Sequence, residues 1–337
     1  MAKKLKPAVI YRAVRNRVFL KANTGSIGIG LIGIAGWGTT NAFNVMRSRR
    51  FNICGVYDPQ IQPSSQFAMR YRTTCFEQLD EMLKDRSIRA IAATVPNHVH
   101  ADIVKVAADA GKHIFIEKPL ASHPAICREL GEYCLGKGVV LQVGHQMHRE
   151  PVFREIKRLL SSGELGQPLF AQAVYTLERQ SRDDWRQDAA TCPGGSMEQL
   201  GVHLIDVLFY LFGQPLDIQG WAENIPRILD GPDWGSVTLS FDHNVYATIS
   251  TSFSSPKHRR LEVFFDGGRL VTDGHTLWIS RAGSNLRKIK PKGLEGGVAQ
   301  FIEFADCIEQ GKEPKIGGIQ AAAMMDVVHS IYNARVI

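Results

Sequence analysis

A short polar run, Glu117-Lys118-Pro119-Leu120, directly follows the apolar segment 113–116. That segment indicates a buried parallel strand, and a lysine just past the carboxyl end of such a strand lies where open α/β sheets bind ligands. Partial burial there can lower the pKa of a lysine toward neutrality, so Lys118 could both donate and accept a proton. These four residues alone are equally compatible with a solvated lysine in a strand-to-helix loop.

A second polar group, Glu198, Gln199, His203 and Asp206, lies at helical spacing in the second half of the chain. Gln199 and His203 are four residues apart and share one helix face, whereas Glu198 points elsewhere unless the helix starts there. Two glycines at 194 and 195 would let the start of the helix approach a ligand, although a structural histidine is the alternative. A glutamate five residues before a histidine is a poor zinc spacing, so we predict no metal site.

A glycine-rich run, Gly33-Ile34-Ala35-Gly36-Trp37-Gly38, follows a predicted strand at 27–33 and opens a predicted helix. Gly33 would permit a tight turn and Gly38 a close approach of helix and strand, with the helix N-terminus facing a pyrophosphate. The literal Gly-x-Gly-x-x-Gly match at 28–33 is rejected because it lies inside the strand. Ala35 stands where a second glycine is commoner and should crowd the diphosphate, while Gly36 could give the backbone room to shift. A glycine-rich turn without a ligand is the alternative.

Two further residues follow predicted strands at the same sheet edge. Asp58 ends the strand 51–57, about 20 residues past the loop, where a carboxylate accepts hydrogen bonds from an adenosine ribose and repels a 2′-phosphate. It therefore favours NAD over NADP, unless it belongs to a solvated Asp-Pro turn. Pro96-Asn97 follows the strand 90–95, so Asn97 could contact the ribose or nicotinamide, or simply cap a helix.

The elements that must position these residues change in character along the chain. Up to about residue 145, strands alternate with helices, which predicts right-handed crossovers and a parallel sheet with helices on both faces. The later part contains several strands at hairpin spacing with flanking helices, which predicts a mostly antiparallel sheet covered on one face. The later strands are predicted at 168–176, 237–241, 245–253, 260–265, 268–273 and 276–279, and the helices at 152–160, 197–212, 299–311 and 319–336.

Charge and composition limit the function classes. The 337 residues suggest about two domains, and the formal net charge is +7. Residues 1–25 contain seven of the basic residues and no acidic residue, so the remainder is balanced and does not indicate a nucleic-acid-binding face. This arm is interpreted either as a disordered leader (or an upstream start codon) or as an arm that packs on a neighbouring subunit.

The cysteines and the hydropathy of the chain indicate the cellular compartment in which the protein is expected. The six cysteines form no Cys-x-x-Cys pair, which favours a reducing environment without structural zinc. No apolar run approaches the ~20 residues needed to span a bilayer, and the basic arm lacks the features of a secretory signal. We therefore predict a cytoplasmic protein without a membrane partner.

Taken together, these motifs resemble the glucose–fructose oxidoreductase / inositol dehydrogenase / MocA (Gfo/Idh/MocA) family of NAD(P)-dependent oxidoreductases over about residues 26–336. The resemblance rests on these segments: Gly33–Gly38, 96–100, 117–119, Trp185-Arg186, Gly194-Gly195 and 201–206. It implies a Rossmann dinucleotide-binding domain at 26–146 and a C-terminal substrate-binding α/β domain at 147–337. The open sheet of the second domain would support a homodimer or homotetramer.

The resemblance also implies roles for particular residues. Lys118 and His203 would flank the substrate carbon over the nicotinamide, Glu117 would contact the nicotinamide ribose, and the Lys118–Pro119 bond could be cis. Family members often have an aspartate four residues before the histidine, where this chain has Gln199. An amide cannot exchange a proton, so Glu198 is a candidate substitute.

The leading hypothesis is a reversible hydride transfer between nicotinamide and a secondary alcohol of a sugar, inositol or related polyol. Either Lys118 or His203 would take the hydroxyl proton, and the other would polarise the same oxygen. Arg149, Trp185 and Arg186 are candidates for holding the substrate, and Arg179, Arg182 and Arg186 could indicate an acidic sugar or merely a solvated loop. Two alternatives are a glycoside-cleaving enzyme that oxidises its sugar transiently with NAD, and a non-catalytic dinucleotide-sensing regulator.

Overall fold

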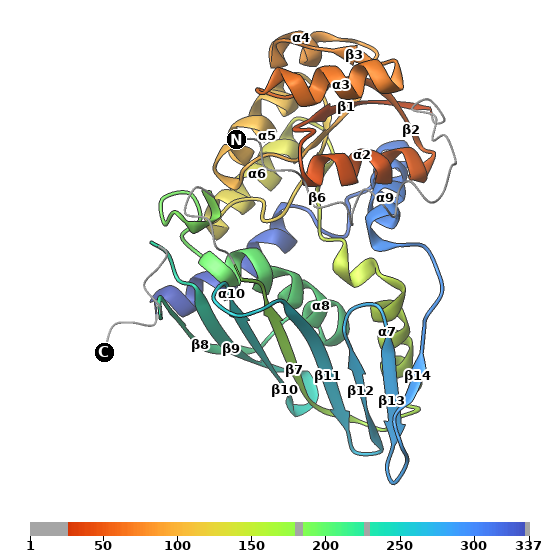
Figure 1. Ribbon diagram of the computed structural model, residues 1–337, viewed down its shortest axis with the longest axis vertical. Coiled ribbons are helices and arrows are strands. Elements are labelled where there is room, and N and C mark those ends of the chain that lie inside the picture. The colour runs from red at the N-terminus through yellow and green to blue at the C-terminus, as the bar shows by residue number, and fades with distance from the viewer. Residues whose placement is uncertain (1–25, 179–184, 226–229, 334–337) are drawn as a thin grey trace.

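The computed structural model describes residues 26–178, 185–225 and 230–333, which form two sheets stacked along the long axis of the molecule (Figure 1). The predicted arm at 1–25, together with Arg179 and Arg182, lies outside the described residues. No described helix is both long and apolar enough to cross a membrane.

The N-terminal sheet has six described strands, all parallel, in the order β3-β2-β1-β4-β5-β6. This confirms the predicted parallel sheet, and its central strands are buried apolar runs because helices cover both faces. The order reverses between β1 and β4, and ligands of such sheets bind beside that point. The strands are β1 (Ile27–Ile32), β2 (Phe51–Tyr57), β3 (Thr74–Cys75), β4 (Ala90–Ala93), β5 (His113–Ile116) and β6 (Leu141–Val143).

Helices connect these strands, and the start of α6 (Pro124–Gly136) is capped by a histidine. His123 is the N-cap of α6, and its Nδ1 accepts a hydrogen bond from the Ala125 backbone N–H. The Ser122 hydroxyl donates to Glu198 of the second domain. The helices are α2 (Trp37–Ser48), α3 (Ile61–Tyr71), α4 (Leu79–Lys84), η1 (Asn97–Val99), α5 (His100–Asp109) and α6 (Pro124–Gly136).

The second sheet has eight described strands in the order β14-β13-β12-β11-β7-β10-β9-β8. Only β7 and β10 pair in parallel, so the predicted mostly antiparallel sheet is confirmed. The two strands that the sequence pattern did not indicate, β8 and β14, are the edges, where half-exposed side chains weaken the alternation. The strands are β7 (Pro168–Thr176), β8 (Asp217–Glu223), β9 (Trp234–Phe241), β10 (Val245–Ser252), β11 (His258–Phe265), β12 (Gly268–Thr272), β13 (Leu277–Arg281) and β14 (Arg287–Ile289).

Helices α8 (Val202–Phe212) and α10 (Gly318–Asn333) lie between the second sheet and the N-terminal domain (Figure 1). A π-helical turn, η4 (Met197–Gly201), leads directly into α8, so the predicted helix 197–212 is continuous but changes its winding. The remaining elements are η2 (Met147–Arg149), α7 (Pro151–Ser162), η3 (Trp185–Gln187), η5 (Asp242–Asn244) and α9 (Gly296–Gln310).

Helix α9 returns from the second half of the chain to the N-terminal domain, where it lies beside α2 (Figure 1). Its Phe301 ring packs on Phe115 of β5 with centroids 4.3 Å apart, and its Phe304 stacks on Phe51 of β2 at 5.9 Å. Helix α10 likewise packs against α6. Two C-terminal helices thus help to fix the edge of the parallel sheet against the second domain.

Candidate active site

Lys118 and His203 come from different domains and lie close enough for the lysine charge to lower the pKa of the histidine. Lys118 follows β5, and its peptide bond to Pro119 is cis, as the resemblance implied. Its Nζ donates a hydrogen bond to the Gln199 carbonyl in the π-helical turn, at 2.9 Å. His203 lies one turn further along the same helical segment, and π-helical turns occur often at functional sites.

His203 is held as a neutral imidazole. Burial lowers its pKa well below 6.5, and the nearby charges of Lys118, His145 and Arg259 lower it further. Its buried Nδ1 has no hydrogen-bond partner among the described residues. Near neutral pH the ring therefore keeps a nitrogen lone pair that can accept a proton.

Behind His203 lies a buried cluster of His145, His148 and Asp206 that sequence reasoning largely missed. His148 Nδ1 is 2.8 Å from both Asp206 carboxylate oxygens, and His145 Nδ1 is 4.0 Å from Oδ2. Burial opposes ionisation of Asp206, but the charge and hydrogen bond of His148 outweigh it and lower its pKa. Burial lowers the pKa of His145 to about 4. His145 comes just after β6, which ends at Val143. Lys118 was singled out because it follows the carboxyl end of a parallel strand, and the same reasoning could have indicated His145.

Glu117 connects the start of α2 to the end of β5. Its Oε1 accepts hydrogen bonds from Asn41 Nδ2 at 2.7 Å and from Trp37 Nε1 at 3.1 Å. Burial raises its pKa, although those hydrogen bonds favour the ionised form. The carboxyl group therefore lies beside the glycine-rich loop. Asn41, which holds it there, had no sequence signal beyond its position in the helix.

The glycine-rich loop has the geometry that its sequence suggested. A Cβ on Gly33 would lie 2.3 Å from the Thr94 carbonyl oxygen, and one on Gly38 would lie 2.0 Å from the Gly33 oxygen. Gly33 and Gly36 both have positive φ, at 76° and 55°. A Cβ on Gly36 would have no neighbour within 4 Å among the described residues, which leave the space above the loop open.

Asp58 completes a cradle at this edge of the sheet. Its Oδ2 accepts the Ile34 backbone N–H of the loop at 2.9 Å, and its Oδ1 accepts the Gln60 N–H at 2.9 Å. The N-terminus of α2 has no side-chain cap, so its backbone N–H groups suit a phosphate. An uncapped helix start, an open glycine turn and a carboxylate at the next strand together fit a dinucleotide.

Glu198 links the two domains. Its fully buried carboxylate accepts hydrogen bonds from Asn97 at 3.1 Å, Ser122 at 2.8 Å and the Gly194 N–H at 2.9 Å, and burial raises its pKa. These bonds go to neither Lys118 nor His203. Asn97, with Pro96 before it, is thereby held at the cleft.

The Gln199 side chain also turns away from Lys118. Its Nε2 donates to the Cys192 sulfur at 3.4 Å, so only the Gln199 backbone carbonyl contacts the lysine. A proton relay through this amide side chain has no support in the geometry.

The three candidates for holding the substrate separate into two places. Arg149 is buried, donates to both Glu303 oxygens at 3.0 and 2.9 Å and also bonds the His145 carbonyl, so the structure places it in the protein interior. Trp185 packs edge-to-face on His98 of the N-terminal domain at 6.2 Å, and the Arg186 guanidinium lies 4.3 Å from the Trp185 ring centroid. The structure brings this pair, but not Arg149, to the boundary of the two domains.

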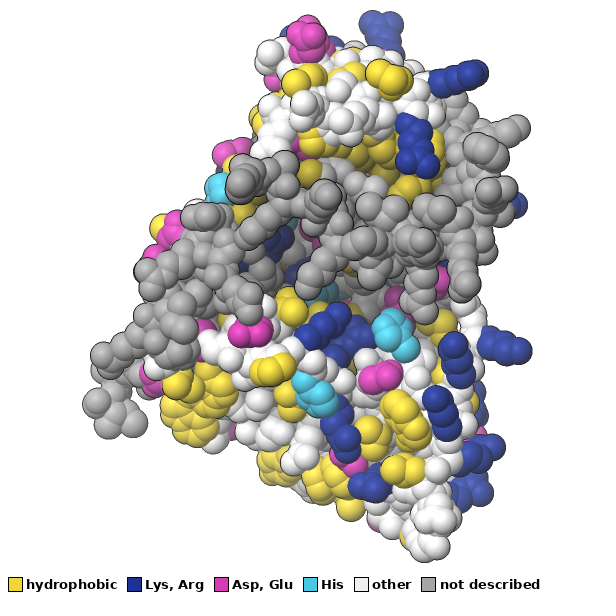
Figure 2. All heavy atoms as spheres, viewed as in Figure 1, with side chains coloured by type: hydrophobic (Ala, Val, Ile, Leu, Met, Phe, Trp, Pro, Cys, Tyr) yellow, Lys and Arg dark blue, Asp and Glu magenta, His cyan; other side chains and the backbone are white. Residues whose placement is uncertain are grey.

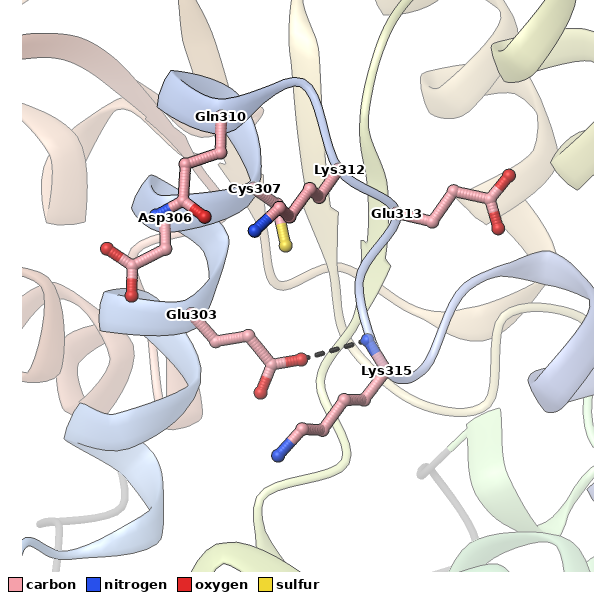
Figure 3. A pocket seen from close by; sticks show the side chains of 7 residues that line it. All are labelled: Glu303, Asp306, Cys307, Gln310, Lys312, Glu313 and Lys315. Atoms are coloured by element: carbon pink, nitrogen blue, oxygen red, sulfur yellow. Dashed lines mark hydrogen bonds between the residues drawn. The ribbon is translucent and has the colours of Figure 1, made fainter.

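A small surface pocket at the end of α9 is separate from this site (Figure 3). Its Glu303 carboxylate is already bound by Arg149 and the Lys315 N–H, and burial raises the pKa of Cys307 to about 11. Within the described residues, no cluster of three or more histidine, cysteine or acidic side chains could hold a metal ion.

A parallel sheet with a glycine-rich loop at its switch point and an acid after the second strand defines a Rossmann-type dinucleotide-binding protein. Family models agree: "Oxidoreductase family, NAD-binding Rossmann fold" matches residues 27–145, and "GFO/IDH/MocA C-terminal domain" matches residues 153–271. The chain belongs to the Gfo/Idh/MocA family of oxidoreductases.

Individual relatives support this assignment. The chain is 25% identical to D-xylose 1-dehydrogenase [NADP(+)] of Haloarcula marismortui over 77% of this chain and 76% of the relative. It is 27% identical to scyllo-inositol 2-dehydrogenase (NAD(+)) of Bacillus subtilis over 73% and 75%. The structure of a levoglucosan dehydrogenase in complex with NADH and levoglucosan has the same fold, with a TM-score of 0.82, 18% identity and coverage of 91% and 96%. The protein is thus an oxidoreductase of a family that includes sugar and inositol dehydrogenases, with NAD and NADP both represented.

Proposed function

We propose that the protein is an NAD-preferring dehydrogenase that interconverts a secondary alcohol and a ketone on a sugar, inositol or related polyol. The observation that supports this most directly is the 2.9 Å hydrogen bond from Lys118 Nζ to the Gln199 carbonyl. It holds an amine one helical turn from the His203 imidazole, at the edge of the parallel sheet where the dinucleotide cradle lies. Two groups active in proton transfer beside one cofactor are what alcohol oxidation requires.

The cofactor would be held by residues from three strand ends. The loop Gly33–Gly38, with Ala35 and Trp37 exposed on it, would receive the diphosphate at the N-terminus of α2. Asp58 would bind the adenosine ribose, and Glu117, with Pro96 and Asn97 nearby, would lie on the nicotinamide side. Bound there, the nicotinamide supplies the hydride acceptor.

The protonation state of His203 suggests which of the two groups, Lys118 or His203, accepts the proton. A neutral imidazole can take the hydroxyl proton as the carbinol is oxidised, because its pKa is well below 6.5. Lys118, whose charge lowers that pKa, would donate a hydrogen bond to the same oxygen and stabilise its developing negative charge. In the reverse direction the same imidazole would return the proton.

The preference for NAD follows from the charge around Asp58. A carboxylate repels a 2′-phosphate, and the eight residues after Asp58 contain no lysine or arginine that could bind one. The two backbone N–H groups that donate to Asp58 orient its carboxylate while leaving acceptor capacity for ribose hydroxyls.

The test is a screen of sugars, inositols and glycosides with NAD and with NADP, followed by absorbance and by NMR of the product. We expect a ketone product with stoichiometric NADH, a higher kcat/KM with NAD, and loss of turnover in His203→Gln. Release of free sugar without net NADH would assign glycoside cleavage instead. Tight NADH binding with no oxidation of any member would contradict the proposal.

A further inference from the structure

A further arginine, Arg259, lies on β11 of the large sheet, on the sheet face that the helices cover. It pairs with Tyr175 across the antiparallel strands β11 and β7, so the two side chains lie on the same face. Leu261 and Val263, at the alternate positions of β11, are buried on that face against the covering helices. Arg259 therefore projects toward α8 and the N-terminal domain. Figure 2 shows basic and histidine side chains, with an acidic one among them, gathered on the upper part of the visible face of the second domain.

The hairpin between β12 and β13 orients the Arg259 guanidinium. Its Nε donates to the Asp273 carbonyl at 2.9 Å, and its Nη2 lies 3.1 Å from His275 Nε2. Gly274, between these two residues, has a φ of 92°. A Cβ at this position would lie 2.2 Å from Arg259 Nη2, so the turn has room for the guanidinium only because residue 274 is a glycine. The arginine is thus held in one place by three consecutive residues.

No carboxylate among the described residues lies within ion-pair distance of Arg259. The charge of Arg259 acts on two carboxylates, Asp273 and Glu150, but neither is within ion-pair distance. The Asp273 carboxylate accepts the backbone N–H groups of His275 and Thr276. The guanidinium has five N–H donors, and the hydrogen bonds to described residues use only Nε and Nη2. A half-buried, oriented guanidinium with an unused Nη1 can bind a carboxylate or phosphate oxygen.

Tyr175 connects this arginine to the reacting groups. Its ring centroid is 6.3 Å from that of His203 on one side and 6.0 Å from the Arg259 guanidinium carbon on the other. The charge of Arg259 also contributes to lowering the pKa of His203, which agrees with this proximity. A sugar lying against the tyrosine ring would place one carbon at His203 and another substituent at Arg259.

We infer that Arg259 binds an anionic group of the substrate, so that the substrate class is an acidic or phosphorylated sugar rather than a neutral polyol. This inference rests on the proposed function, because it assigns a substrate group to Arg259, next to the residues that would carry out the proposed reaction. The shared chemistry is an anionic oxygen group, which a uronate carboxylate or a sugar phosphate could supply.

The test uses the full-length protein with NAD and sugars that differ in one exocyclic group: D-glucose, D-glucuronate and D-glucose 6-phosphate, and the same three forms of D-galactose. We expect one anionic form to exceed its neutral parent in kcat/KM by about 10–100-fold, the range for a charge-assisted hydrogen bond. Arg259→Gln should bring that ratio toward one. The better anion identifies the source of the charge.

Arg260→Gln is the matched control, because Arg260 is the next residue of β11, lies on the opposite face and pairs with Glu262. It should leave the ratio unchanged. Equal kcat/KM for neutral and anionic forms, or a ratio that survives Arg259→Gln, would overturn the inference.

Calorimetric binding to the NADH-loaded protein separates this inference from the proposed function. If no sugar is oxidised but D-glucuronate or D-glucose 6-phosphate binds more tightly than D-glucose in an Arg259-dependent way, the dehydrogenase proposal fails and the anion site stands. If neither anion binds more tightly than D-glucose, the anion site fails whether or not oxidation occurs.

Discussion

Arg149 and Arg259 both follow the parallel sheet in the chain, yet the structure uses them in opposite ways. Arg149 is buried and bound by both oxygens of Glu303. Arg259 is half-buried, and among the described residues its printed contacts are a backbone carbonyl, an imidazole and an aromatic ring. A fully paired buried charge holds elements together, because removing either partner leaves the other uncompensated. A charge without a carboxylate partner is available to a ligand. Pairing with a carboxylate, more than burial, thus distinguishes an arginine of the protein framework from one that a ligand could use.

The largest effect is expected from removing the amine of Lys118, which lies beside His203 in the proposed site. Lys118→Ala should lower kcat by about 10²–10⁴-fold, because a positioned proton-transfer or polarising group contributes that much. NADH binding, measured by fluorescence titration, should persist. Lys105→Ala is the control, since Lys105 forms an exposed ion pair with Glu129 on the protein surface. Turnover equal to that of the unaltered protein would remove Lys118 from the mechanism.

Removing the framework arginine should give the opposite result. Arg149→Met should lower the free energy of unfolding by about 3–5 kcal/mol, because Glu303 is left with an unpaired charge. The KM for the sugar should change little. Urea denaturation checks the first value, and the double variant Arg149→Met/Glu303→Gln should recover part of the loss. A large rise in KM at unchanged stability would place Arg149 in the substrate site after all.

Acid should weaken the interior beside the cleft. The pKa of His145 is about 4 in the fold and about 6.5 when unfolded, so between these values the unfolded chain binds the extra proton. Its contribution to stability is complete above pH 6.5 and is lost as the pH falls toward 4, by at most roughly 3 kcal/mol. His145→Leu should therefore show a shallower fall in unfolding free energy between pH 7 and pH 4.5. Identical slopes would contradict the assignment.

The smallest effect is expected at the cofactor cradle. Asp58→Asn keeps the acceptor for the Ile34 N–H but removes the charge that repels a 2′-phosphate. The ratio of kcat/KM for NAD to that for NADP should fall by about tenfold, equivalent to about 1.4 kcal/mol. Asp102→Asn, on the exposed surface of α5, is the control. An unchanged ratio would show that Asp58 does not select the cofactor.

The sequence predicted what depends on local pattern. Alternating strands and helices fixed the parallel sheet, and the rule that ligands gather at carboxyl strand ends led to Lys118, Asp58 and the glycine loop. The sequence could not predict whether a residue makes its contact through the backbone or the side chain, or which partner a side chain bonds. Gln199 contacts Lys118 through its carbonyl, and Ser122 bonds Glu198 rather than capping a helix.

Contacts between distant segments were also beyond a single sequence. Glu303, the partner of Arg149, is 154 positions away along the chain, and nothing local marks the pair. Tyr175 and Arg259 become neighbours only through the register of β7 and β11. Edge strands and ion pairs of this kind are decided by tertiary packing, which no window of sequence contains.

The return of α9 to the first domain has a consequence for how the protein is made. The rings of Phe51 and Phe115 are covered by Phe301 and Phe304, so that part of the first core is completed by residues translated almost last. A growing chain generally folds its first domain while the ribosome is still working. Here an apolar patch of the first domain stays exposed until α9 has been synthesised, near the end of translation. A fragment that ends at residue 146 should therefore aggregate under conditions in which the full chain does not.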